Sequence, residues 1–110
     1  MGKANNETYD PNGIVLSEWR VDGNGVLVAG TYTKGSVLGK DGNGDYELAA
    51  TAASAEAILL EDVVLTANGN APILLGGEVA EQDLVLGAAL TIADVADVLR
   101  DKNIYIKKRG

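Results

Sequence analysis

The stretch from Gly30 to Val79 is a series of short apolar runs separated by glycine-rich turns, and this pattern most constrains the fold. Gly, Asn and Asp between the runs favour tight turns. The runs themselves are rich in Val, Ile and Leu, and the β-branched residues among them suit a pleated, half-buried surface. The stretch therefore predicts a series of short β-strands that supplies surfaces and packing rather than catalytic groups.

The turns bound the expected strands. The tetrapeptide Asp-Gly-Asn-Gly occurs at 22–25 and again at 41–44, and each copy predicts a turn because Gly and Asn tolerate positive φ. The second copy lies between two strand-like segments, which indicates a hairpin. Another turn is expected at 68–72, and the pair Gly76-Gly77 indicates a bulge. The expected strands are residues 25–33, 34–40, 45–50, 57–60, 63–65 and 73–80.

One helix is expected, and it begins after Thr91. Thr91 and Asp94 have the spacing of a capping box. The run from Ala52 to Leu65 can also be drawn on a helix, but its Ile-Leu-Leu and Val-Val-Leu phrases are typical of buried strands. A short strand is expected at 104–106, after the helix. The apolar stripe of that helix is Ile92, Val95, Val98 and Leu99.

The first residues differ from the rest of the chain. Residues 1–13 are polar and hold almost nothing to bury, so we expect a flexible arm. Residues 14–20, with the sequence IVLSEWR, could form a strand joined to that arm. The predicted architecture is an α+β fold, a mostly β small domain with one short C-terminal helix and a flexible N-terminal arm. Residues 1–20 would form the arm and residues 21–110 the folded domain.

The residues that the chain lacks exclude several classes of function. Without His or Cys, the Ser-His and Cys-His nucleophile pairs, disulfides and thiolate metal sites are impossible. The net charge of −7 argues against nucleic-acid binding, and the run Lys107-Lys108-Arg109 is expected to be a solvated tail. No apolar run approaches the about 20 residues that span a bilayer, and residues 1–13 lack the apolar core of a signal peptide. We expect no membrane contact and no enzymatic activity.

One acidic segment resembles a calcium-binding loop at its start. Asp41, Asn43 and Asp45 match the first ligand positions, but Tyr46 stands where that loop requires Gly and Ala52 where it requires Glu. A hairpin turn explains the same residues. No catalytic, metal or cofactor-binding residue is therefore expected in this chain.

Several short sequence phrases occur in an order that is typical of one family. They are Gly35-Ser-Val-Leu-Gly-Lys40, Gly44-Asp-Tyr-Glu-Leu48 and Ile58-Leu-Leu-Glu-Asp-Val63, followed by Leu75-Gly-Gly-Glu78 and the ending Asn-Ile-Tyr-Ile-Lys. Together these phrases resemble the head decoration protein family of tailed bacteriophages, of the lambda-like type. The resemblance covers about residues 26–107 and rests on the order and spacing of the phrases.

The resemblance implies a structural role on a virus particle. Such proteins sit as homotrimers at three-fold positions on the outer surface of the expanded capsid, after synthesis in the host cytoplasm, and stabilise the shell against internal DNA pressure. The implied partner is the major capsid protein of the phage head. In the family, the N-terminal arm orders against the capsid and adds a strand to its sheet. The residues expected to contact the capsid are Ile14, Val15, Leu16 and Trp19.

Two alternatives stay open at the level of sequence. Trp19 either anchors the chain to the capsid or covers the core of the domain. The chain could also be a small β-rich module that binds carbohydrate or a host surface.

Overall fold

Short strands dominate the secondary structure, as the sequence predicts. The computed structural model describes residues 15–88 and 90–108. The mostly β α+β fold is confirmed, whereas the predicted flexible arm falls largely on residues 1–14, outside the described residues. The strands are β1 (Val21–Leu27), β2 (Gly30–Tyr32), β3 (Val37–Lys40), β4 (Tyr46–Leu48), β5 (Ala55–Leu59), β6 (Val63–Leu65), β7 (Gly69–Ala80) and β8 (Ile104–Lys107); α1 spans Ile92–Asp101, and short 3-10 turns occupy Ala52–Ser54 and Glu81–Asp83.

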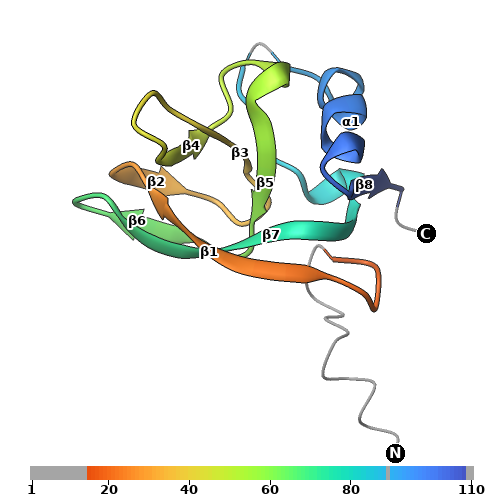
Figure 1. Cartoon of the computed structure of the whole chain (residues 1–110), viewed down its shortest axis with the longest axis horizontal. Helices are drawn as coiled ribbons and strands as arrows, with labels where there is room; N and C mark the ends of the chain where they lie inside the picture. Colours follow the sequence, from red (N-terminus) through yellow and green to blue (C-terminus); the bar gives the residue numbers. More distant parts are fainter. Residues whose placement is uncertain (1–14, 89, 109–110) are drawn as a thin grey trace, which may run out of the picture.

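The main sheet curls until its first strand meets β7. The strand order is β1-β4-β3-β5-β7-β8, and β1 pairs in addition with β7. The β1–β7 ladder is antiparallel and runs from Val21 opposite Gly76 to Leu27 opposite Gly69. Strands β1 and β4 share one parallel pair, Leu27 with Tyr46. Strands β1, β4, β3, β5 and β7 therefore form a closed ring, with β8 beyond β7 (Figure 1). Closure pairs backbone groups that an open sheet would leave at its edges.

Two apolar clusters fill the two faces of this ring. Neighbouring residues such as Ile58 and Leu59 belong to different clusters, because successive side chains of a strand point to opposite faces. Strands β3, β5 and β7 are thus buried on both faces, which explains their continuous apolar runs. The inner cluster draws on all five ring strands and consists of Leu27, Leu38, Tyr46, Ala57, Leu59, Ala71 and Ile73. The outer cluster includes residues of α1 and β8 and consists of Val15, Val37, Ala49, Ala55, Ile58, Leu74, Val79, Val95, Leu99 and Ile104.

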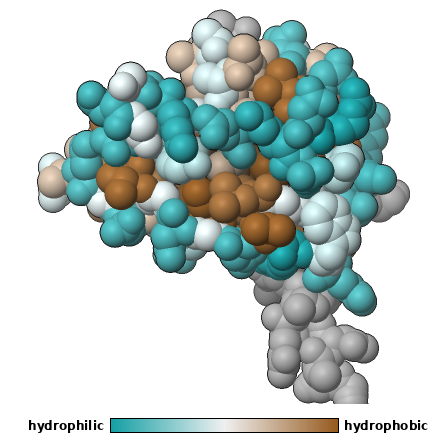
Figure 2. Space-filling view, in the orientation of Figure 1, coloured by the Kyte–Doolittle hydropathy of each residue, from teal (hydrophilic) through white to brown (hydrophobic). Residues whose placement is uncertain are grey.

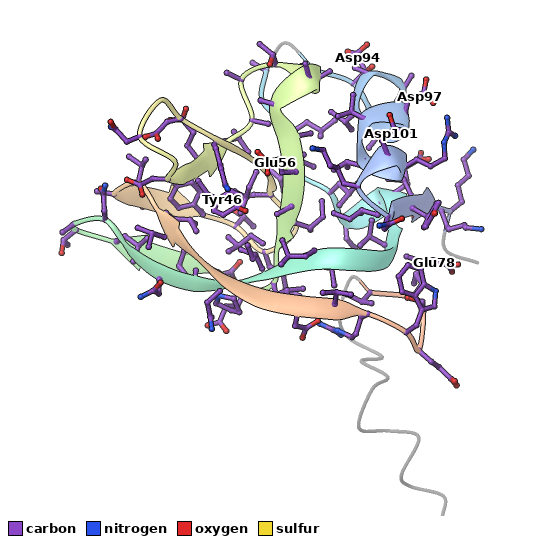
Figure 3. The ribbon with its side chains drawn as sticks, viewed as in Figure 1. Tyr46, Glu56, Glu78, Asp94, Asp97 and Asp101 are labelled. Atoms are coloured by element: carbon purple, nitrogen blue, oxygen red, sulfur yellow. The ribbon has the colours of Figure 1, made fainter. Side chains whose placement is uncertain are left out.

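The two copies of Asp-Gly-Asn-Gly adopt different structures. The copy at 41–44 forms the predicted turn, and the hairpin of β3 and β4 is confirmed by the pairing of Lys40 with Tyr46. The turn predicted at 22–25 is wrong, because these residues lie inside β1 and pair with β7. A Cβ atom on Gly25 would lie 2.6 Å from the Tyr46 ring. The bare glycine backbone therefore lets the ring of Tyr46, which lies between β4 and β1 (Figure 3), pack against the strand.

Strand β7 begins earlier than the sequence predicts. The turn expected at 68–72 ends at Asn68, since β7 starts at Gly69 and includes Pro72. The carbonyl oxygen of Pro72 accepts a hydrogen bond from the Leu60 amide at 3.1 Å. Proline lacks an N–H group, but it fits here because it pairs with β1 at a position where no N–H is needed.

The bulge predicted at Gly76-Gly77 lies one residue earlier, at Leu75, within an unbroken β7. The register of the β1–β7 ladder shifts between Val21 and Asp22, which leaves Leu75 of β7 without an opposite residue. Directly after the shift, Gly77 adopts a φ of 142° and begins the parallel pairing with β8. The glycine pair thus marks the point where β7 exchanges one partner strand for another.

Helix α1 follows the prediction closely. The Thr91 hydroxyl accepts a hydrogen bond from the Asp94 amide at 3.2 Å, and the Thr91 amide donates to the Asp94 carboxylate at 3.0 Å, which completes the capping box. Val95 and Leu99 are fully buried against the sheet. Strand β8 confirms the strand expected after the helix. Over the residues described, no helix has the length and apolar character needed to cross a bilayer.

Strands β2 and β6 form a separate two-stranded ribbon at the end of the molecule away from α1 (Figure 1). Thr31 lies opposite Val64, whose side chain is 75% exposed. The Tyr32 hydroxyl donates a hydrogen bond to the Val28 carbonyl at 2.7 Å. Burial of this phenol, and secondarily the nearby charge of Glu47, raise the pKa of Tyr32 above its ordinary value.

We expect Gly35→Ala to destabilise the protein by about 3 kcal/mol or more. Gly35 has a φ of 95°, and a Cβ atom there would overlap the backbone carbonyl oxygen of Asp83. Gly42→Ala is the matched control, because a Cβ atom there meets nothing within 4 Å; it should change stability by no more than about 0.5 kcal/mol. Urea unfolding followed by circular dichroism measures both. Equal midpoints for the two variants would contradict the close approach at Gly35.

Candidate functional site

The residues predicted to contact a partner precede β1, and the structure places three of them against or beside β7. Val15 forms an antiparallel bridge with Val79. The Leu16 amide donates a hydrogen bond to the Glu78 carbonyl at 2.7 Å. The Ser17 hydroxyl accepts from the Glu78 amide at 3.0 Å and donates to the Trp19 carbonyl at 2.6 Å. Residues 15–17, here called the β7 strap, are therefore part of the folded domain.

Val15 is a core residue in this structure. Its side chain is 4% exposed and belongs to the outer cluster with Val79 of β7 and Leu99 of α1. Only detachment of the β7 strap would present this side chain to a partner. Ile14, which was predicted to act with Val15, lies outside the described residues.

Leu16 and Trp19 are more accessible. Leu16 is half-buried, and Trp19 is 47% exposed. The indole ring packs edge-on against the Tyr105 ring of β8, with a centroid separation of 6.2 Å and an interplanar angle of 67°. Trp19 thus packs against Tyr105 of β8 with one side and faces solvent with the other. A half-exposed Trp is a frequent binding hot spot.

A second apolar surface lies where β1 pairs with the irregular part of β7, and we call it the β1–β7 seam. Val21 is 52% exposed and Leu75 is 38% exposed. Both side chains lie over glycines: a Cβ atom on Gly23 would be 2.9 Å from Leu75 Cδ1, and one on Gly76 would be 3.3 Å from Val21 Cγ2. Figure 2 shows hydrophobic residues gathered along the middle of the face on which β1 and β7 lie, bordered by hydrophilic ones.

Sequence reasoning missed the β1–β7 seam. Val21 stands next to the glycine-rich segment that was assigned to a turn, and Leu75 lies in a run that is otherwise buried. The signal that could have found it is the pair of glycines, Gly23 and Gly76, because bare backbone leaves neighbouring side chains uncovered. The Gly76-Gly77 pair indicates a bulge beside Leu75, but it does not show that the register shift exposes the Leu75 side chain.

The charged groups around these surfaces are solvated or serve local structure. Asp94, Asp97 and Asp101 lie along α1 (Figure 3), and Asp97 forms an exposed ion pair with Arg100 at 2.6 Å. The Asp41 carboxylate accepts hydrogen bonds from the amides of residues 43 and 45 at 2.8 and 3.0 Å, so it stabilises the hairpin turn. Within the described ranges, no group of three or more His, Cys, Asp or Glu residues could hold a metal ion.

Comparison with known proteins adds no family assignment, since no protein-family model and no curated protein sequence matches this chain. The geometry itself offers a half-exposed indole and an apolar seam. These are features that suit binding to another macromolecular surface.

We expect Val15→Ala to lower the free energy of unfolding by about 2 kcal/mol, because it removes fully buried methyl groups from the outer cluster. Trp19→Ala should lower it by about 1 kcal/mol or less, since half of that side chain already faces water. Thermal and urea unfolding of the two variants give the comparison. A larger loss for Trp19→Ala than for Val15→Ala would show that the indole, and not the β7 strap, holds the segment in place.

Proposed function

We propose that the chain is a phage head decoration protein that binds the outer surface of an expanded capsid as a homotrimer and stabilises the shell. Its partner in this proposal is the major capsid protein, and its place is the exterior of the virion. It acts by binding alone, without a catalytic residue, a cofactor or direct contact with nucleic acid.

The observation that carries the proposal is where the phrases that resemble the decoration protein family lie in the folded chain. The phrases that begin at Gly35 and Gly44 contain β3 and β4, and the phrase that begins at Ile58 contains the last two residues of β5 and the first residue of β6. Strand β3 pairs with both β4 and β5. Phrases that are separate in the sequence are therefore neighbours in the sheet. This is expected if the phrases together build a structural unit that the family shares.

The β7 strap suggests how an arm would be attached. Residues 15–17 are fixed to β7 by a buried valine and two hydrogen bonds to Glu78, and the Ser17 hydroxyl also donates to the Trp19 carbonyl. Residues 1–14 lead into this fixed point and include Ile14. Their binding to a capsid strand would gain main-chain hydrogen bonds, and three copies in a trimer would raise their effective concentration.

One observation favours the alternative of a carbohydrate or host-surface binding module. Trp19 presents a half-exposed aromatic ring beside Tyr105, and apolar rings of this kind can pack against a flat ligand. The alternative predicts that ligand binding raises the melting temperature by mass action and does not require residues 1–14.

The test compares three proteins on expanded, undecorated capsids of the phage that carries the chain. They are the full chain, a truncation that begins at Val15, and the full chain with Trp19→Ala. Starting the truncation at Val15 keeps the buried strap, so melting curves can verify that the domain is intact. Cryo-electron microscopy of the mixtures, with light scattering of the free proteins, reports capsid binding and trimer formation.

We expect three-fold protrusions with the full chain, and their loss or strong weakening with the truncation. Protrusions that persist without residues 1–14 but disappear with Trp19→Ala would place the binding energy on the folded body. A monomeric full chain that leaves the capsids bare would contradict the decoration function. A melting-temperature rise with an oligosaccharide panel, abolished by Trp19→Ala, would then favour the alternative.

A further inference from the structure

The chain contains four Asn-Gly pairs, at 12–13, 24–25, 43–44 and 68–69. The last three differ in their hydrogen bonds and in their burial. Asn-Gly is the dipeptide most prone to spontaneous deamidation, because glycine leaves its own amide nitrogen unhindered. In that reaction the backbone nitrogen after Asn attacks the side-chain amide carbon. The reaction therefore needs a mobile Asn side chain and a glycine amide that is free to approach it. The pair at 12–13 lies outside the described residues.

The pair Asn24-Gly25 is held in the β1–β7 ladder. The Pro72 carbonyl accepts from Leu60 on the β5 side, so Pro72 directs its backbone away from β1. Because neighbouring residues of an antiparallel strand bond to opposite sides, Ala71 directs its backbone groups toward Gly25, with which it is paired. Gly25 is also buried beneath the Tyr46 ring. Its amide can reach the Asn24 side chain only if the ladder opens.

The pair Asn68-Gly69 is held by its side chain as well as by its backbone. The Asn68 side-chain oxygen accepts from the Ala29 amide at 2.9 Å, and its nitrogen donates to the Asp45 carboxylate at 3.2 Å. Gly69 is the first residue of β7 and pairs with Leu27 of β1. Both reacting groups are thus occupied in the folded protein.

The pair Asn43-Gly44 is the least restrained of the three. Both residues are exposed in the turn between β3 and β4, and Gly44 adopts a φ of 86° with no neighbouring atom within 4 Å of a Cβ position. No hydrogen bond to a described residue holds the Asn43 side chain. The Gly44 amide makes one hydrogen bond, at 3.2 Å, to the Asp41 carbonyl within the same turn.

We propose that Asn43 is a deamidation site of the folded protein and that Asn24 and Asn68 are protected. The Gly44 nitrogen forms a bond to Cγ of Asn43, the bond from Cγ to Nδ2 breaks, and the side-chain nitrogen leaves as ammonia with the amide proton. Water then opens the five-membered imide at either carbonyl. The products are aspartate and isoaspartate at position 43, and water is the one co-reactant.

The modification would change the hairpin in two ways. It adds a carboxylate to a turn that already contains Asp41 and Asp45, and like charges in one turn repel each other. Isoaspartate also inserts one extra methylene into the backbone between β3 and β4. A protein that persists for long periods in a particle would accumulate this change with age.

The test is peptide mapping of the full chain after incubation in mildly alkaline buffer at physiological temperature. Digestion with trypsin and a glutamate-specific protease separates the sites, because the three pairs fall in Val21–Lys34, Asp41–Glu47 and Asp62–Glu78. Mass spectrometry detects the replacement of the amide by a carboxyl group, and isoaspartate methylation detects the second product. A parallel incubation in concentrated urea removes the protection, and Asn43→Gln verifies the position of the mass gain.

We expect Asp41–Glu47 to convert more than about tenfold faster than the other two peptides in the folded protein, because they react only through local opening. In urea the three peptides should convert at similar rates. Equal native rates, a faster reaction at Asn24 or Asn68, or no native conversion of the Asn43 peptide would each overturn the proposal. Persistence of the mass gain in Asn43→Gln would overturn the assignment to Asn43.

Discussion

The antiparallel pairing of β1 with β7 is the interaction on which the rest of the structure depends. It converts a row of strands into a ring, since β1 also meets β4 at its far end. Once the ring is closed, its strands have an inner and an outer face, and each face carries an apolar cluster. A domain of 110 residues has limited surface to bury. Strands that are apolar on both faces let it bury two clusters with few large side chains and no Phe.

The identical tetrapeptides at 22–25 and 41–44 show what local sequence can and cannot determine. The second copy forms the predicted turn, because β3 and β4 follow each other directly and pair across it. The first copy becomes strand, because β7, far along the chain, offers a complete partner and Tyr46 occupies the space that side chains would need. A local turn preference contributes less free energy than the many backbone hydrogen bonds of a long strand pairing. The helix was predictable for the opposite reason, since its capping box and apolar stripe are both local.

The sequence singles out residues 14–19 as an expected contact segment, but it does not show how these residues lie on the domain. An apolar run next to a polar segment marks residues 14–19 as a place of contact, and the sequence supports that much. Which of those side chains faces the domain depends on the bridge between Val15 and Val79, a pairing of residues far apart in the chain. Val15 is therefore buried and Trp19 is half exposed, although the two looked equivalent in the sequence. The β1–β7 seam was missed because the glycines indicate a bulge without showing which side chains the register shift exposes.

Ring closure also limits how a partner can bind. A protein that joins others by strand addition must either present a free sheet edge or donate a strand of its own. In the described part of the chain, β3, β5 and β7 are paired on both sides, whereas β1 meets β4 only at Leu27 and β8 is the last strand of the order. The ribbon of β2 and β6 has only three residues in each strand. The side of β1 that faces away from β7, paired only at Leu27, is therefore the longest free edge among the described residues. A partner strand that added there would also lie next to the apolar side chains of the β1–β7 seam, so main-chain and side-chain contacts would be made at the same place.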